Sequence, residues 1–185
     1  MKNFAKLAAV VLAAASMSSY AAPIASTGAG LSIIVSGTSH VIATYEGTSA
    51  SYSNNLYLGN RLLFNNHTTA VGTFIDLGSY AVGTELIFRL EVVNTANNFF
   101  TGAALRNPDN HAHARVQSDY LDAGTTLVSF EDLFNGPYDY NDLSFTFTNT
   151  TAAVNLANNV PEPGSLALLS LGLAGLVAQG KRKQR

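Results

Sequence analysis

The sequence predicts an all-β domain, a β-sandwich of jelly-roll-like topology, over residues 23–148. Short runs of Val, Ile, Leu, Phe and Tyr alternate there with segments rich in Asn, Thr, Ser and Gly, which is typical of strands joined by turns. No part of this region shows a sustained helical period. About nine short strands in such a length are enough to build two packed sheets.

The strands follow one another at short intervals along the domain. Alternation is clearest in residues 143–148, where Leu and Phe share one face and hydroxyl side chains the other. The longest candidate, 85–94, is expected to be a central strand. The predicted strands are 31–36, 40–45, 55–58, 61–65, 72–77, 85–94, 112–117, 125–130 and 143–148.

The N-terminal 22 residues read as a secretory signal peptide used by the Sec export machinery. Lys2 and Lys6 precede an apolar stretch at 7–15, and Ser19 and Ala21 supply small residues at the −3 and −1 positions of a cleavage site. We expect cleavage after Ala21 or the next alanine. The alternative is an uncleaved N-terminal membrane anchor.

The C-terminal segment, 161–185, combines a stiff peptide, an apolar run and a basic end. Pro161, Glu162 and Pro163 precede residues 165–178, which carry no charge. This run is shorter than the ~20 residues that span a bilayer comfortably, so we expect a short transmembrane helix. The alternative is a buried helix of a globular domain, although the run lacks a polar face. The basic residues that would keep this end cytoplasmic are Lys181, Arg182, Lys183 and Arg185.

This ordered combination resembles the PEP-CTERM sorting signal of Gram-negative bacteria that produce exopolysaccharide. The resemblance implies recognition by an exosortase, a membrane protease that acts near Pro161–Pro163. The precursor would then sit in the inner membrane through its C-terminal helix, with the domain in the periplasm. The mature form would reach the cell surface or the extracellular space. Residues 149–160, rich in Asn, Thr and Ala, are expected to be a linker.

The composition of the region between the two signals excludes several function classes. Residues 23–160 hold four arginines, no lysine and eleven acidic residues, a formal charge of −7. Binding of nucleic acid through a basic surface is therefore excluded, whereas a divalent cation or a neutral polar partner fits. The chain has no cysteine, so thiol catalysis and cysteine-based metal sites are excluded as well.

Residues 131–142 concentrate carboxylates between two predicted strands. Carboxylates packed closely repel one another unless a cation, hydrogen bonds or protonation offsets the charge. Ca²⁺ takes such oxygen ligands, although the spacing is not that of an EF-hand. Two alternatives remain: side chains that cap backbone N–H groups in turns, and a pair for acid–base catalysis. The candidate Ca²⁺ ligands are Glu131, Asp132, Asp139, Asn141 and Asp142.

The same loop resembles the F-E-D-L…D-Y-N-D-[LV]-x-F signature of an uncharacterised β domain found in PEP-CTERM and other exported bacterial proteins. The matching residues are Glu131–Leu133, Asp139–Leu143 and Phe145. Upstream matches at 41–43, 52–58, 100–102, 106–109 and 113–114 extend the likeness over nearly the whole domain. The resemblance implies fold and export, and it carries no activity.

Two further patterns have both a functional and a structural interpretation. His111 and His113 would share one face of a strand and could bind a transition metal with Asp109, or they could be two exposed histidines at a strand start. The aromatic residues could form a carbohydrate platform or the core. We therefore expect a non-enzymatic envelope, matrix or biofilm protein that associates with exopolysaccharide. The alternatives are a secreted glycoside hydrolase using Glu131 and Asp139, and a purely structural adhesin-like module.

Overall fold

The computed structural model of the chain describes residues 21–154. Most of the predicted signal peptide, including Ser19, and the whole predicted sorting segment lie outside this range. Within it, no helix has the length and apolar character needed to cross a bilayer. The structure therefore concerns the domain between the two signals.

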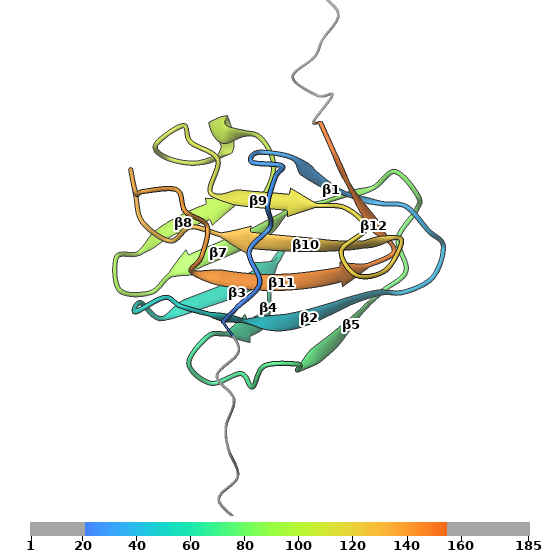
Figure 1. Ribbon diagram of the computed structural model, residues 1–185, viewed down its shortest axis with the longest axis horizontal. Coiled ribbons are helices and arrows are strands. Elements are labelled where there is room, and N and C mark those ends of the chain that lie inside the picture. Colours follow the sequence, from blue (N-terminus) through green and yellow to red (C-terminus); the bar gives the residue numbers. More distant parts are fainter. Residues whose placement is uncertain (1–20, 155–185) are drawn as a thin grey trace, which may run out of the picture.

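Three antiparallel sheets make up this domain, which confirms the all-β class (Figure 1). The five-stranded sheet has the order β5 (Phe74–Gly78), β2 (Val41–Thr48), β11 (Leu143–Thr148), β10 (Thr125–Phe130), β9 (Ala114–Gln117). The four-stranded sheet has the order β4 (Arg61–Asn65), β3 (Asn54–Leu58), β7 (Phe88–Val92), β8 (Asn97–Phe100). A small sheet has the order β12 (Thr150–Ala153), β1 (Ser32–Val35), β6 (Glu85–Leu86), and one 3₁₀ turn, η1, spans Ala104–Arg106.

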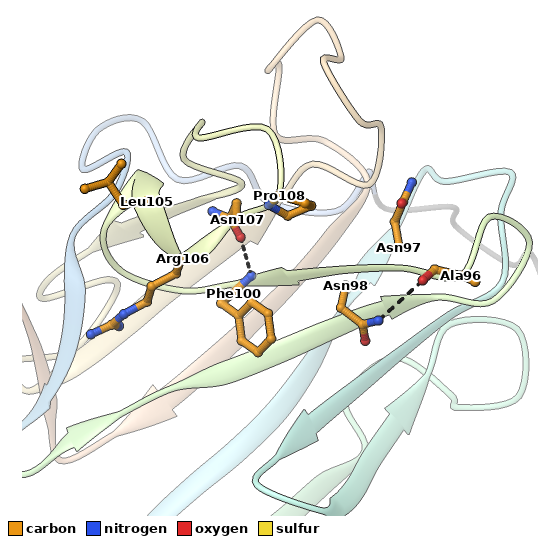
Figure 2. Close-up of a pocket in the computed structure, with 8 residues that line it drawn as sticks. All are labelled: Ala96, Asn97, Asn98, Phe100, Leu105, Arg106, Asn107 and Pro108. Atoms are coloured by element: carbon orange, nitrogen blue, oxygen red, sulfur yellow. Dashed lines mark hydrogen bonds between the residues drawn. The ribbon is translucent and has the colours of Figure 1, made fainter.

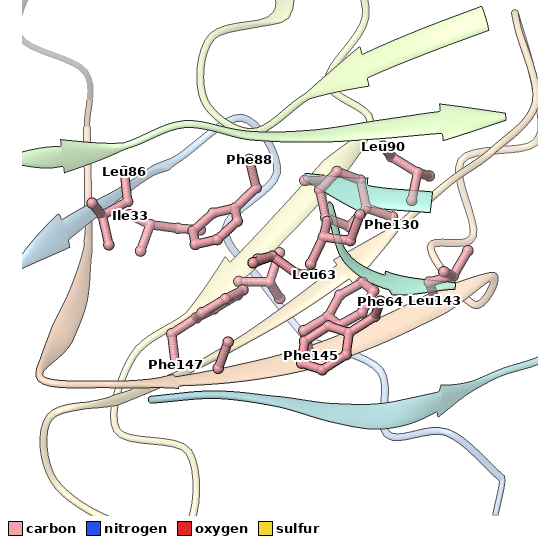
Figure 3. Close-up of a cluster of buried hydrophobic side chains, with 14 of the residues drawn as sticks. Ile33, Leu63, Phe64, Leu86, Phe88, Leu90, Phe130, Leu143, Phe145 and Phe147 are labelled. Carbon is pink, nitrogen blue, oxygen red and sulfur yellow. The ribbon is translucent and has the colours of Figure 1, made fainter. Parts of the chain in front are cut away.

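The hydrophobic core lies between the five-stranded and four-stranded sheets (Figure 3). Phe145 and Phe147 project from β11 into this core, as the alternation in the sequence predicts, and both are fully buried. The ring of Phe147 stacks on Phe88 of β7 with centroids 4.1 Å apart. Tyr45 and Phe64, one from each sheet, pack against Phe145. The two sheets are thus joined by aromatic contacts across the core.

A segment at the start of the described chain covers the outer face of the five-stranded sheet, and we call residues 22–30 the N-terminal strap (Figure 1, blue). The backbone N–H of Ala25 donates to Oγ of Ser129 at 2.8 Å, and the hydroxyls of Ser129 and Ser144 lie 3.1 Å apart beneath the strap. Gly28 has φ +85°, and a Cβ there would lie 2.1 Å from the carbonyl oxygen of Val116. The strap explains why Ser144, which the alternation of β11 places on the face opposite the core, is buried together with Ser129.

The structure departs from the predicted strands in three places. The predicted strand 85–94 divides at Ile87: β6 pairs with β1, whereas β7 is central in the four-stranded sheet. β8 was not predicted, because Asn97 and Asn98 favour turns over strands. The prediction that residues 149–160 form a linker is wrong at its start, because Thr150–Ala153 forms strand β12 and pairs with β1. The described chain begins at one edge of the domain and ends at the opposite edge (Figure 1).

Candidate functional site

The predicted acidic loop joins β10 to β11. Phe130 pairs with Leu143 across the two antiparallel strands, so residues 131–142 leave and re-enter the sheet at the same point. The N–H of Glu131 donates to the carbonyl of His113 at 2.9 Å, and the N–H of Asp142 donates to the carbonyl of Phe130 at 3.1 Å. The first bond ties the start of the loop to the segment before β9, and the second holds the two ends of the loop side by side.

Three carboxylates converge where the loop begins and ends, and we call Glu131, Asp132 and Asp142 the acidic triad. One oxygen of each lies within 4.8 Å of the others. Glu131 and Asp132 are only 1% and 3% exposed. The N–H of Asp132 donates to Oδ2 of Asp142 at 2.8 Å, and the N–H of Leu133 donates to Oε1 of Glu131 at 3.1 Å. Nδ2 of Asn54, on β3, donates to Oδ2 of Asp132 at 2.7 Å.

The electrostatics of the triad disfavour three charged carboxylates. Burial raises the pKa of Glu131, Asp132 and Asp142. The charge of Asp142 raises the pKa of Glu131 further, and the charges of Asp132 and Asp139 do the same for Asp142. Within residues 21–154, the ion pairs join His40 to Asp76, Arg106 to Glu85, and His111 and His113 to Asp109, and none includes the triad.

The structure brings together three of the five residues predicted as Ca²⁺ ligands. Asp139 is exposed, and its Oδ2 accepts a hydrogen bond from Nδ2 of Asn141 at 2.7 Å. The hydroxyl of Ser49, which directly follows β2, donates to the carbonyl of Asn141. This bond holds the outer part of the loop against the end of β2. Asp139 and Asn141 therefore belong to the outer part of the loop. Asn54 was missed, and no local pattern in the sequence relates it to the loop, which lies 78 residues further along.

The predicted pair of histidines does not form one site. β9 begins only at Ala114, so His111 and His113 are not on a strand. His113 is fully buried and stacks on Phe99 with ring centroids 3.6 Å apart, whereas His111 is exposed. Nε2 of His113 lies 2.8 Å from Oδ2 of Asp109 and its Nδ1 lies 2.9 Å from the carbonyl of Glu131. Neither nitrogen of His113 is available to a metal, and the prediction of two exposed histidines is wrong for His113.

The side chain of Asp109 binds the middle of the acidic loop, away from the triad. Its Oδ2 accepts hydrogen bonds from the hydroxyl of Tyr138 at 3.0 Å and from the N–H of Asn135 at 3.1 Å. Asn135 and Tyr138 have positive φ values, 52° and 54°, a conformation that costs free energy in residues other than glycine. The buried carboxylate of Asp109 therefore holds the loop in a shape that it would not otherwise favour.

A separate surface depression of about 500 Å³ lies between β8 and η1 (Figure 2). Phe100, Leu105 and Pro108 provide its apolar contacts, and Nδ2 of Asn98 bonds the carbonyl of Ala96 at its border. No carboxylate lines it. The two carboxylates predicted for a hydrolase therefore do not open into this depression.

Comparison with known proteins identifies the C-terminal segment. Residues 159–183 match the PEP-CTERM protein-sorting motif, which confirms the resemblance seen in the sequence. No curated protein and no solved structure matches the chain. The motif marks an exported protein that an exosortase sorts and that is attached to the membrane as a precursor.

Proposed function

We propose that this chain is a non-enzymatic β-sandwich module that an exosortase delivers to the cell surface or extracellular matrix. The observation that carries the proposal is the sorting motif at 159–183, which follows a domain whose last strand ends at Ala153. Only residues 154–158 intervene, and five residues reach at most about 18 Å even when fully extended. The domain would therefore stay close to the membrane until the protease releases it.

The burial of the triad supports a display role over hydrolysis. A glycoside hydrolase needs two carboxylates that flank the sugar bond in an accessible cleft. Of the two carboxylates predicted for a hydrolase, Glu131 is 1% exposed, whereas Asp139 belongs to the exposed outer part of the loop. A sugar could not contact both side chains without displacing the loop.

The outer face of the four-stranded sheet supports contact with an uncharged exopolysaccharide. The guanidinium of Arg89 lies over the ring of Tyr57, 4.0 Å from its centroid. Oε2 of Glu91 accepts hydrogen bonds from Nδ2 of Asn55 and the hydroxyl of Tyr57, both at 3.0 Å. A guanidinium nitrogen of Arg89 donates to Oδ1 of Asn98 at 2.6 Å. This array offers planar polar groups and an aromatic ring with balanced charge, which suits hydroxyl-rich, uncharged sugars.

The sorting part of the proposal is tested by replacing Pro161, Glu162 and Pro163 together with alanine in cells that contain an exosortase. We expect the precursor to accumulate uncut in the membrane fraction, as shown by immunoblotting with an antibody against the domain. Asn158→Ala, just upstream of the Pro-Glu-Pro peptide, is the matched control and should be processed normally. Normal processing of the triple variant would contradict the proposal.

A further inference from the structure

The geometry points to a Ca²⁺ site that Glu131, Asp132 and Asp142 form with Asn54, and that joins the two main sheets at one edge. The triad lies at the end of β10 and the start of β11, in the five-stranded sheet, whereas Asn54 begins β3 of the four-stranded sheet. A bound cation would therefore clamp the acidic loop and both sheets together. This inference concerns the domain alone and is independent of sorting.

The first argument is uncompensated negative charge. The ligand oxygens of the triad lie within 4.8 Å of one another, and the ion pairs of residues 21–154 bring no positive side chain to them. Buried charges are stable only when paired or bound to a metal. A divalent cation supplies the missing charge.

The second argument is independent of charge and comes from buried acceptors that lack a donor. Oε2 of Glu131 and Oδ1 of Asn54 are buried and have no hydrogen-bond partner among the described residues. The residues that carry these atoms are 1% and 0% exposed. Such atoms are rare in folded proteins, and a bound ion or ordered water is the usual explanation. Nδ2 of Asn54 faces Asp132 at 2.7 Å, so a half-turn of this amide would bring its unpartnered oxygen to the triad.

The donor set selects the metal. All available ligand atoms are oxygens, since the chain has no cysteine and both ring nitrogens of His113 are engaged by Asp109 and Glu131. Oxygen-only sites favour Ca²⁺ or Mg²⁺ over zinc and other transition metals. Two oxygens that share a Ca²⁺ ion lie at most about 4.6–5.2 Å apart, and the ligand oxygens of the triad, all within 4.8 Å of one another, meet this limit. Mg²⁺ prefers to keep several waters, for which a buried site has little room.

The loop backbone also closes tightly over this site. A Cβ on Gly136 would lie 2.8 Å from Oε1 of Glu131 and 2.6 Å from Cβ of Leu133. The N–H of Gly136 donates to the carbonyl of Leu133 at 3.0 Å. The close approach of this backbone leaves Glu131 no outward path to solvent, so its free oxygen must be satisfied inside the loop.

The test is thermal unfolding of the full chain in detergent, followed by circular dichroism, in EDTA and across a CaCl₂ titration to 10 mM. A ligand that binds only the folded state raises the Tm, and modules of extracellular proteins bind Ca²⁺ with Kd values of ~10⁻⁴–10⁻³ M. We expect a rise of roughly 5–10 °C at 10 mM CaCl₂. The same concentration of MgCl₂ should give a much smaller rise. No rise with CaCl₂ would overturn the inference.

Two variants locate the site. Glu131→Gln removes one charge with little change in volume, so it should fold in EDTA with a Tm at or above that of the unchanged protein and should lose the response to Ca²⁺. Asp122→Asn, at an exposed carboxylate outside the acidic loop, should keep the full response. A response that survives in the first variant, or that disappears equally in both, would place any bound Ca²⁺ elsewhere.

A direct binding measurement keeps the inference testable if Glu131→Gln fails to fold. Tb³⁺ replaces Ca²⁺ at oxygen sites, and its luminescence is excited through nearby tyrosine. Tyr140, in the same loop and 5% exposed, is the expected donor. We expect tyrosine-sensitised luminescence from the unchanged protein that Ca²⁺ displaces and that Tyr140→Phe reduces. Absence of sensitised emission at millimolar Tb³⁺ would contradict the site.

Discussion

Nε2 of His113 lies 2.8 Å from Oδ2 of Asp109, and the two side chains are 0% and 1% exposed. His113 reaches the acidic loop through the carbonyl of Glu131, and Asp109 reaches it through Asn135 and Tyr138. This buried pair therefore connects the segment before β9 to the whole loop. Removing one partner of a buried pair leaves the other charge or acceptor uncompensated.

The first prediction concerns Asp109→Asn and pH. Burial would raise the pKa of Asp109, but hydrogen bonds from His113, Asn135, His111 and Tyr138 outweigh it and hold the pKa well below its usual range. A lowered pKa contributes stability above the unfolded value of about 3.9, and this stability is lost as pH falls toward the folded value. We expect the variant to lose about 3–5 kcal/mol at pH 7.

Urea unfolding between pH 2.5 and 7 measures both parts of this prediction. The stability difference between Asp109→Asn and the unchanged protein should shrink as pH falls below about 4. Asp122→Asn, at an exposed carboxylate, is the control and should follow the unchanged protein. A difference that stays constant across the whole range would contradict the role assigned to the Asp109 carboxylate.

The second prediction concerns the N-terminal strap. Gly28→Ala places a Cβ at φ +85° and 2.1 Å from the carbonyl oxygen of Val116, so the strap must shift away from β9. Gly59→Ala has a similar backbone, φ +57°, but no atom within 4 Å, and serves as the control. The control should cost about 1–2 kcal/mol from backbone strain alone, and Gly28→Ala clearly more.

Hydrogen exchange distinguishes a local shift of the strap from general destabilisation. The N–H of Ala25, which donates to Ser129, should lose protection in Gly28→Ala and keep it in Gly59→Ala. Equal protection of Ala25 in both variants would show that the strap tolerates the added methyl group.

The third prediction concerns the core between the sheets. Phe147 is fully buried and stacks on Phe88 at 4.1 Å, so Phe147→Ala should lower the free energy of unfolding by about 3–5 kcal/mol. Phe74, on β5, is 69% exposed, and Phe74→Ala should change stability by less than about 0.5 kcal/mol. Urea unfolding of both variants tests the assignment, and a similar loss in the two would contradict the described packing.

The fourth prediction concerns the outer face of the four-stranded sheet. Tyr57→Ala removes the ring under Arg89 and one hydrogen bond to Glu91, and it should reduce binding to an uncharged polysaccharide at least tenfold. Phe134→Ala, an aromatic residue that is 46% exposed on the acidic loop, is the control and should bind normally. Co-sedimentation with insoluble polysaccharide measures both. Unchanged binding by Tyr57→Ala would contradict the role of this face and would favour the alternative, a purely structural adhesin-like module.

The sequence predicts the domain well where signals are local. The alternation of β11 correctly identifies Phe145 and Phe147 as core residues, because strand periodicity depends only on neighbouring residues. The division of the strand 85–94 depends on partners: β6 pairs with β1 and β7 with β3, thirty or more residues away in each case. Strand pairing over such separations leaves no mark on the local pattern.

The same limit applies to the candidate site. The loop that carries Glu131, Asp132 and Asp142 was predicted because its carboxylates are close in sequence. Its subdivision into a buried triad and an exposed outer part depends on the register of β10 and β11. Asn54 reaches the site only because the two sheets pack face to face.

The described chain begins and ends at opposite edges of the domain, and this gives the protein a polarity during maturation (Figure 1). The first and the last described residues therefore lead away from the domain in different directions. A protein fused before the first described residue would therefore leave the domain at the edge opposite the one from which the chain continues to the sorting motif.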